Sequence, residues 1–395
     1  MERRFDSKKT RRVAIKVGSR IICNDQGLAF DRLRALSGQM DLLRRRGMEL
    51  IVVSSGAVAA GKKKMKDARG GPATLIKKQA LAAIGQVHLM AAWDKAFSAH
   101  DVKVAQILLT AEDLADRHRF IHAKNTLSAL LEMSVVPVVN ENDTIATEEL
   151  KFGDNDALGG LVASMAEADI FINLTDLDGL YESDPRRNPA AALIKVVEKV
   201  TPALLAQAGK DAGTPLGTGG MHSKVKAAGR LAERGLPSLI ANGLTRDVLP
   251  RLMDGEELGT FFKPSLKPRG AKKHWLAFAA RPKGKLTIDR GAAEALRDQG
   301  KSLLPKGIRE TEGVFLAGDP VTIATPEGDG PGGELGVGLV NYPSAELRRI
   351  MGRGSREIPG ILGFCHSEEA IHRDNLAIFD DGRDREDAKD GSAAG

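Results

Sequence analysis

Short runs of aliphatic and β-branched residues alternate with longer amphipathic stretches over the first two thirds of the chain. Strands are predicted at residues 12–17, 49–55, 102–110, 134–140, 168–176 and 236–242, and helices at residues 31–46, 72–97, 119–132, 157–167 and 220–234. Apolar strands joined by helices are typical of a parallel sheet that helices cover on both faces. The pattern therefore predicts an α/β fold, a three-layer αβα sandwich with a mainly parallel central sheet.

The pattern changes after residue 263. Residues 264–274 contain two prolines and several basic residues, which indicates a linker. Beyond it come one predicted helix at 291–300 and short apolar runs separated by Gly and Pro, namely KLTID, VFLAG, PVTIAT and LGVGLVNY. These predict a small, β-rich, barrel-like domain over residues 275–379. The first domain then spans residues 12–263, a polar extension covers 1–11, and the charged residues 380–395 are expected to be disordered.

Composition and charge narrow the function classes. Hydrophobic residues make up 42% and charged residues 28%, as in soluble globular proteins. The net charge of +6 favours an anionic partner, but the basic residues are concentrated in segments 1–12, 62–78 and 263–273, and the rest is mildly acidic. With only 4% aromatic residues, the chain offers few rings for base stacking. A nucleic-acid interface over the whole surface is therefore disfavoured.

Targeting and cysteine signals point to a cytoplasmic protein. The two cysteines, Cys23 and Cys365, lie far apart and outside any Cys/His cluster, so neither a disulfide nor a metal site is predicted. The polar N-terminus lacks the apolar core of a signal peptide, and no apolar run reaches the ~18 residues that a membrane span needs. We expect no membrane partner.

Polar residues and glycines gather where the predicted strands end. At the end of the first strand, an ammonium group and an unhindered glycine backbone occur in Lys16-Val17-Gly18-Ser19. After the second strand, a helix begins with Ser54-Ser55-Gly56-Ala57. The backbone N–H groups of such glycine-containing loops and helix starts can bind a phosphate. An edge lysine and a plain helix cap are the alternative interpretations. A P-loop is disfavoured, because Lys63 stands where that motif requires Ser or Thr.

Two acidic and amide-rich clusters and one glycine-rich turn complete the set. Residues 140–143 (NEND) follow a predicted strand, and residues 152–156 (FGDND) open the next helix, with a hairpin expected between them. They favour a ligand site over ordinary Asx turns, because ligands of parallel sheets gather at the carboxyl ends of the strands. Residues 217–224 (GTGGMHSK) begin another helix with a lysine in its first turns, a pattern typical of a polyphosphate site.

Taken in order, these motifs resemble the amino acid kinase superfamily. KVGS, SSGAVAAG, NENDTIATEELKFGDND, LTDLDGLYESDPR and GTGGMHSK, over residues 16–224, are most similar to the glutamate 5-kinase family. SLLPKGI (302–308) and IHRDN (371–375) resemble the PUA domain that many bacterial members carry. The resemblance covers nearly the whole chain except its two polar ends.

The resemblance implies a role for each matching position. Lys16 and Lys224 would stabilise the phosphoryl group in transfer, and Asp156 would hold both lysines. The implied substrate-binding residues are Ser55, Gly56, Ala57, Asp143 and Asn155. The implied ATP-binding residues are Lys16, Thr175, Asp176, Thr218, Gly219, Gly220, Met221, His222, Ser223 and Lys224. One position departs from the family: Arg20 stands where a second small hydroxyl residue is usual, and it is expected to face outward.

The implied reaction is the ATP-dependent phosphorylation of the γ-carboxylate of L-glutamate to L-glutamyl 5-phosphate, the first step of proline biosynthesis. Mg²⁺ would accompany ATP, and proline would be a feedback inhibitor. The resemblance also implies a homo-oligomer, a dimer or tetramer, and makes glutamyl-phosphate reductase a plausible partner. Two alternatives stay open: a superfamily member with a different acceptor, and an RNA-binding or RNA-modifying protein. Nucleic-acid binding by the PUA-like domain is not expected but is not excluded.

Overall fold

The computed structural model describes residues 5, 7, 9–65, 74–146, 155–209, 220–265, 275–276, 280–326 and 333–379 of the chain. These form two compact units. The N-terminal unit comprises residues 1–114 and 118–268, and the C-terminal unit comprises residues 115–117 and 269–395.

The N-terminal unit is built on an eight-stranded sheet with the strand order β5-β6-β4-β1-β7-β9-β10-β8. The strands are β1 (Arg12–Val17), β4 (Glu49–Ser54), β5 (Val104–Leu109), β6 (Val136–Glu141), β7 (Ile170–Thr175), β8 (Val196–Val197), β9 (Ser238–Asn242) and β10 (Thr260–Phe262). The first six strands in this order are mutually parallel, whereas β10 pairs antiparallel with β9. The predicted mainly parallel sheet is confirmed.

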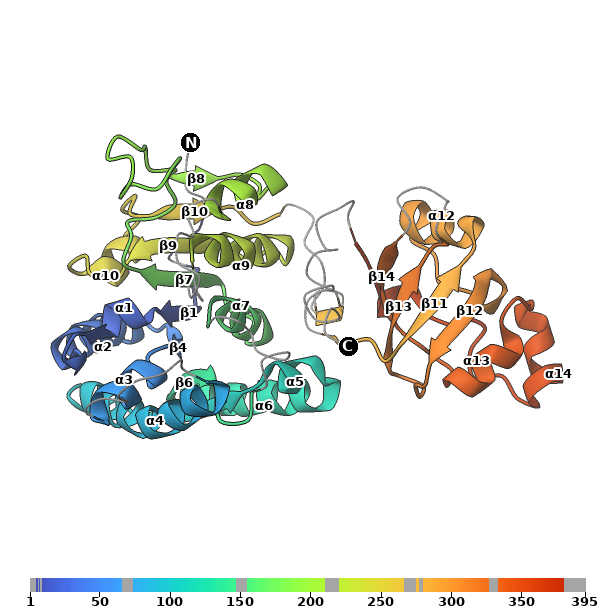
Figure 1. The fold of residues 1–395 in the computed structure, drawn as a ribbon, viewed down its shortest axis with the longest axis horizontal. Helices are drawn as coiled ribbons and strands as arrows, with labels where there is room; N and C mark the ends of the chain where they lie inside the picture. Colours follow the sequence, from blue (N-terminus) through green and yellow to red (C-terminus); the bar gives the residue numbers. More distant parts are fainter. Residues whose placement is uncertain are drawn as a thin grey trace. The chain divides into compact units, whose positions relative to one another are not determined.

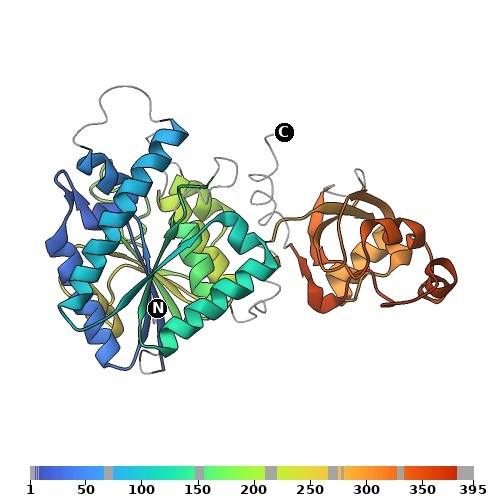
Figure 2. The same ribbon diagram turned by 90° about the horizontal axis from the view of Figure 1, so that it is seen from below.

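Helices cover both faces of this sheet (Figure 1). One face packs against α2 (Phe30–Arg45), α4 (Leu75–Ser98) and α10 (Val248–Met253). The other face packs against α7 (Asn155–Met165) and α9 (Met221–Glu233). Figure 2 shows the twisted strands fanning out between the helices. The three-layer αβα architecture is therefore confirmed.

Further helices and short strands complete the unit. They are α1 (Ser19–Ile22), β2 (Cys23–Asn24), β3 (Gly27–Leu28), α3 (Ala57–Lys64), α5 (Ala111–Ala115), α6 (Arg117–Glu132) and α8 (Pro202–Gly209). Most of the hairpin expected between the two acidic clusters falls on residues 147–154, outside the described residues. In the part of the chain that the structure describes, no helix is long and apolar enough to cross a membrane.

The alternation of side chains along the central strands decides which residues reach the site. In β1, Val13, Ile15 and Val17 face the core formed with α2 and α4. Lys16, one position out of phase, therefore faces α7. The same alternation in β7 places Asn173 and Thr175 on the α7 face, because Ile172 and Leu174 belong to the opposite core.

The C-terminal unit contains a five-stranded sheet with the order β12-β11-β13-β14-β15. Its elements are β11 (Gly284–Ile288), α12 (Arg290–Gln299), β12 (Ile308–Gly313), β13 (Pro320–Ala324), β14 (Glu334–Leu339), α13 (Ser344–Ile350), α14 (Ile358–Leu362) and β15 (Leu376–Ile378). All pairs are antiparallel except β11 with β13. A separate core of aliphatic side chains with Phe315 and Tyr342 fills this unit. The expectation of a small, β-rich domain is confirmed.

One expected strand in this unit is wrong. Residues 314–318 (VFLAG) form the turn between β12 and β13 rather than a strand. Gly313 precedes this segment and Gly318 is its last residue, with φ angles of 84° and 87°, which are left-handed values that interrupt extended backbone. The segment is apolar because Phe315 packs into the core and is only 2% exposed.

Candidate active site

A buried carboxylate forms the centre of the candidate site. Asp156, at the start of α7, is completely shielded from solvent. Its Oδ1 lies 2.5 Å from Lys16 Nζ, and its Oδ2 lies 2.9 Å from Lys224 Nζ. Ser223 Oγ lies 2.8 Å from Oδ2, and Asn173 Nδ2 donates to Oδ1 at 3.0 Å. The structure thus joins Lys16, Asp156 and Lys224, although Asp156 is 140 residues from Lys16 and 68 residues from Lys224 in sequence.

Local sequence explains why these groups meet. Lys16 comes from β1 and Lys224 from the first turns of α9, while Asp156 lies at the start of α7, which packs on the same face of the sheet as α9. A Cβ at Gly159 would lie 2.9 Å from Phe171 Cζ and 3.4 Å from Lys16 Cβ. The glycine therefore allows α7 to pack close to the strands, which brings the carboxylate within reach of both ammonium groups.

The charges in this cluster compensate one another. Burial by itself would raise the pKa of Asp156, but the ammonium groups of Lys16 and Lys224 outweigh that effect and hold the pKa far below its usual range. Asp156 is therefore an anion at neutral pH. One carboxylate facing two lysines, which are 4% and 6% exposed, leaves the cluster with a net positive charge among these three groups. Such a cluster is suited to an anionic ligand.

A second cluster lies next to the first, because Asn155 directly precedes Asp156. The Asn155 side-chain nitrogen lies 2.8 Å from Asn140 Oδ1, 3.0 Å from Ser55 Oγ and 3.0 Å from Ser54 O. These contacts join the carboxyl ends of β4 and β6 to the start of α7. The structure therefore brings together Ser55 and Asn155, two of the five expected substrate-binding residues.

The other expected substrate-binding residues lie in the adjoining loops. Gly56 caps α3 with a φ of 110°, and Ala57 is the first residue of that helix. A Cβ at Gly56 would lie 3.3 Å from Cys23 Sγ, so a side chain would be strained and crowded there. Asp143 is partly buried in the turn after β6.

The expected nucleotide residues fall into two groups. Thr175 ends β7, and its Oγ1 donates to Asp176 Oδ1 at 3.2 Å. Met221, His222 and Ser223 begin α9 after the N-cap Gly220. Ser223 contacts Asp156, whereas His222 Nδ1 lies 3.0 Å from Leu205 O. Thr218 and Gly219 lie outside the described residues.

Arg20 pairs with one of these residues. Its Nη1 lies 2.9 Å from Asp176 Oδ2, although its side chain is 70% exposed. Partial burial would raise the pKa of Asp176, but the hydrogen bond and charge of Arg20 lower it. Because β1 and β7 are neighbours, with Val17 paired to Leu174, the ion pair joins adjacent strand ends. Arg20 is thus solvent-exposed, as expected, and also in contact with an expected ATP-binding residue.

Several polar residues at the site were not singled out from sequence. Asn173 contacts Asp156, and Gln86 Oε1 accepts a hydrogen bond at 2.9 Å from Nδ2 of Asn140, the first residue of the predicted NEND cluster. Trp93 Nε1 donates to Ser54 Oγ at 2.8 Å. A sequence signal existed for Asn173, because an asparagine interrupts the apolar run IFINLT of β7. Gln86 and Trp93 carried no such signal, since they lie in the middle of a long helix.

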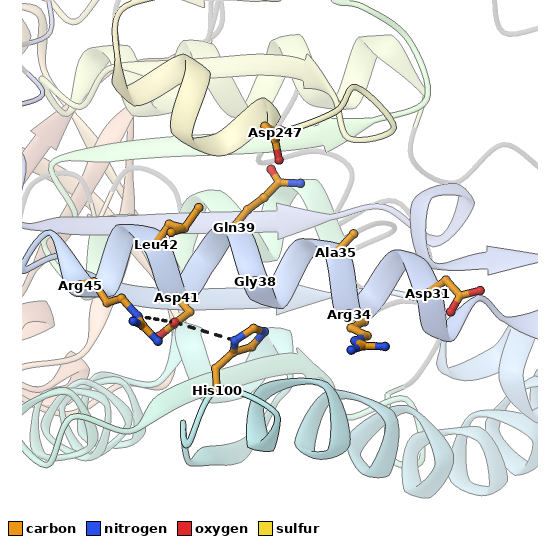
Figure 3. Close-up of a pocket in the computed structure, with 10 residues that line it drawn as sticks. All are labelled: Asp31, Arg34, Ala35, Gly38, Gln39, Asp41, Leu42, Arg45, His100 and Asp247. Atoms are coloured by element: carbon orange, nitrogen blue, oxygen red, sulfur yellow. Dashed lines mark hydrogen bonds and ion pairs between the residues drawn. The ribbon is translucent and has the colours of Figure 1, made fainter.

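A cavity of about 570 Å³ lies along α2 (Figure 3). Asp41 lines it and is paired with Arg45 at 2.7 Å, and His100 Nδ1 lies 3.9 Å from the same carboxylate. None of the residues around Asp156 lines the cavity. The cavity is therefore not part of the candidate site.

Comparison with known proteins decides the family. Residues 11–242, which contain both clusters, match the amino acid kinase family. The chain belongs to this family. Residues 284–362 match the PUA domain, which agrees with the β-rich C-terminal unit.

Relatives of similar length extend the family assignment over both units. A protein named glutamate 5-kinase from Syntrophotalea carbinolica is 48% identical over 370 residues, covering 94% of this chain and 98% of the relative. Proteins of the same name from Thermus thermophilus and Geobacter sulfurreducens are 47% and 45% identical, covering 93% and 94% of this chain and 97% and 98% of those relatives. This member of the amino acid kinase family therefore has the same two-part organisation over nearly its full length.

Proposed function

We propose that the chain transfers the γ-phosphoryl group of ATP to the γ-carboxylate of L-glutamate, giving L-glutamyl 5-phosphate and ADP. The observation that carries the proposal is the buried Lys16–Asp156–Lys224 cluster next to the Asn155–Ser55 cluster. The first offers positive charge for a phosphoryl group, and the second offers hydrogen-bonding groups for a small polar acceptor. The name of the relatives supports glutamate as that acceptor.

The chemistry requires little beyond positioning and charge. A carboxylate acceptor is already ionised at neutral pH, so no general base is needed. The transferred group carries negative charge that spreads over its oxygens in the transition state. Lys16 and Lys224 would neutralise that charge from a site shielded from water, where such interactions are stronger than in bulk solvent. Asp156 would keep both ammonium groups in place before the substrates arrive.

The remaining residues receive roles by position in this proposal. Ser55, Gly56, Ala57, Asp143 and Asn155 would bind glutamate at the ends of β4 and β6 and the start of α7. Thr175, Asp176 and the start of α9, from Gly220 to Lys224, would surround ATP. Thr218 and Gly219 keep the same proposed role.

A divalent metal is implied by the use of ATP, and we propose Mg²⁺. The described residues contain no group of three or more His, Cys, Asp or Glu side chains placed to hold a metal ion. Mg²⁺ commonly binds through substrate phosphates and one or two carboxylates while keeping several waters. The structure fits a metal that arrives with the nucleotide as MgATP, and Asp176 is a carboxylate on the proposed nucleotide side.

A chemical trap tests the proposed reaction. Acyl phosphates react with hydroxylamine, so wild-type protein with MgATP, L-glutamate and hydroxylamine should form γ-glutamyl hydroxamate and one ADP per hydroxamate. Absence of glutamate-dependent hydroxamate from folded protein would refute the proposed acceptor.

Arg20 gives a prediction on the nucleotide side. The Arg20→Ser variant removes the positive charge next to Asp176, so the proposed nucleotide side would attract the polyphosphate of ATP less strongly. We expect the KM for ATP to rise about 3- to 10-fold, which is the effect typical of removing one partly exposed charge beside a binding site. The KM for glutamate should not change. Steady-state kinetics at low and high salt measure this, because screening should shrink the difference.

Arg46→Ser is a matched control for Arg20. Arg46 forms a similar exposed ion pair, 2.7 Å from Asp254, at the opposite end of the strands. An equal rise in the ATP KM for both variants, or none for Arg20→Ser, would contradict the prediction.

Helix α4 supports the proposal of a homo-oligomer. Ile76 and Val87 are 75% and 68% exposed, and Ala80, Ala83 and Ala91 are exposed on the same side of the helix. A surface helix with an apolar outer face is typical of a contact with another chain. We propose that a second copy of this chain covers that face.

Charge on α4 should therefore dissociate the oligomer. We expect wild-type protein to sediment as a dimer or larger species and Val87→Glu to sediment as a monomer. Lys199→Glu, a charge reversal at an exposed residue after β8, at the opposite edge of the sheet from β5, should leave the mass unchanged. Monomeric wild-type protein at micromolar concentration would contradict the proposal.

Two further proposals follow from the resemblance alone. Proline would inhibit the enzyme at or near the glutamate site, and the labile acyl phosphate would pass to a glutamyl-phosphate reductase. Activity measured against increasing proline tests the first, and co-sedimentation with the reductase tests the second.

A further inference from the structure

Asn173 is a polar residue in a fully buried strand of the sheet. It is 1% exposed and lies in β7, whose six residues are all buried. Across the strand pair it is in register with Lys16. Both side chains therefore project side by side from the sheet toward α7.

The hydrogen bond to Asp156 fixes the orientation of the Asn173 amide. An ionised carboxylate can only accept hydrogen bonds, so the amide must present its nitrogen to Asp156 Oδ1, at 3.0 Å. The carbonyl oxygen then points elsewhere and has no hydrogen-bond donor among the described residues. The amide cannot turn to satisfy its oxygen without losing the contact with Asp156.

This arrangement is unfavourable for the fold taken alone. A buried polar atom without a partner destabilises the folded state, whereas an apolar side chain of similar size would not. Leucine fills a similar volume and suits a strand that is otherwise apolar. The contact with Asp156 is thus the feature of Asn173 that favours asparagine at this position.

Asp156 Oδ1 is the oxygen that also binds Lys16. Oδ2 binds Lys224 and Ser223, but the Ser223 hydroxyl lies equally close, at 2.8 Å, to Gly220 O and has one proton to donate. Asn173 is therefore a neutral donor to the oxygen of the carboxylate that also binds Lys16.

We propose that Asn173 is a positioning residue for phosphoryl transfer. It holds the Asp156 carboxylate in the plane in which both oxygens reach their lysines, so that Lys16 and Lys224 are aligned before the transition state forms. The inference rests on the proposed function, since it requires that the two lysines act on the transferred group.

The Asn173→Leu variant separates this role from a structural one. We expect kcat to fall about 10-fold, the lower end for loss of a hydrogen bond to a charged group, with the KM values for ATP and glutamate within about twofold of wild type. The melting temperature should stay the same or rise, because removal of the buried, unpaired carbonyl offsets the lost hydrogen bond to Asp156. A merely structural residue would lower stability and leave kcat unchanged.

Ser238→Ala is the matched control. Ser238, at the start of β9, is also 1% exposed, and its Oγ has no partner among the described residues. Its removal should likewise preserve the melting temperature, but kcat should not change. Asn173→Ala provides a second variant that removes the same donor without adding side-chain volume, and it should also lower kcat.

The outcomes are distinguishable. A kcat within twofold of wild type in folded Asn173→Leu would overturn the assignment, and so would an equal loss in Ser238→Ala. Failure of both Asn173 variants to fold would show that the residue is required for folding, and it would also overturn the assignment. If wild-type protein forms no hydroxamate with glutamate, the proposed function is refuted. That result does not depend on the Asn173 variants, so it can be distinguished from failure of the Asn173 assignment.

Discussion

The Lys224→Ala variant is expected to turn over about 10²- to 10³-fold more slowly than wild type, the loss typical of removing one charge-stabilising group. Lys224 is 6% exposed, and its ammonium group is held 2.9 Å from Asp156. A cation fixed in this way needs no reorganisation when charge develops on the phosphoryl oxygens. Its loss should therefore raise the barrier of the chemical step more than it weakens substrate binding.

Steady-state kinetics with both substrates varied would measure this. The KM for glutamate should stay within a few-fold of wild type. Lys195→Ala is a suitable control, because Lys195 forms an exposed ion pair with Glu257 at 3.2 Å, remote from the cluster. Equal losses of kcat and of glutamate affinity, together with a lower melting temperature, would show that Lys224 supports the fold rather than the reaction.

The Asp156→Asn variant is expected to lose both stability and activity. It leaves the ammonium groups of Lys16 and Lys224 buried without their carboxylate. Breaking a buried ion pair by removing one partner typically costs about 3–5 kcal/mol. The lysines would also repel each other, so turnover should fall at least as far as in Lys224→Ala.

The pH dependence of this effect has a definite sign. The pKa of Asp156 is lower in the folded state than in the unfolded chain, so its ionisation stabilises the fold above the unfolded value of about 4. That contribution declines as pH falls below about 4 toward the folded pKa. The difference in melting temperature between wild type and Asp156→Asn should therefore be constant between pH 6 and 8 and narrow below pH 4. Calorimetry over this range measures it, and a difference that grows on acidification would contradict the assignment.

Much of the N-terminal unit follows from the sequence, because its strands are apolar and its helices are long. β1 spans the predicted residues 12–17, and α2 and α9 differ from prediction by one residue at each end. The helices α3, α8 and α10 are shorter than the window of about 11 residues in which helical periodicity can be recognised, and β8 and β10 are too short for a strand pattern. The sequence could not predict that β10 runs antiparallel to β9, since strand direction depends on how the chain joins the strands in three dimensions.

Site residues were predictable where a charged side chain interrupts an apolar strand or follows a glycine-rich turn. Lys16 breaks an apolar strand, and Lys224 follows a glycine-rich turn, so both were marked by sequence alone. Their common partner, Asp156, was one of several acidic residues in two clusters, and its role came from the family resemblance. Its contact with Asn173 depends on the packing of α7 against the sheet, which becomes visible only in three dimensions.

The contacts around Asn155 also could not be predicted from the sequence. Asn140 was marked as the first residue of NEND, yet its contacts to Asn155 and Gln86 join three separate elements. Arg20 was expected to face outward, and its side chain is indeed 70% exposed. Its pairing with Asp176 was not predictable, because it depends on β1 and β7 being neighbours in the sheet.

A panel of acceptors in the hydroxamate assay tests the central claim most directly. Wild-type protein would be incubated with MgATP and hydroxylamine, and with L-glutamate, L-aspartate, N-acetyl-L-glutamate or no acceptor. The account predicts hydroxamate and matching ADP with L-glutamate and little above background with the others. Strong turnover of another acceptor with none for L-glutamate would contradict it.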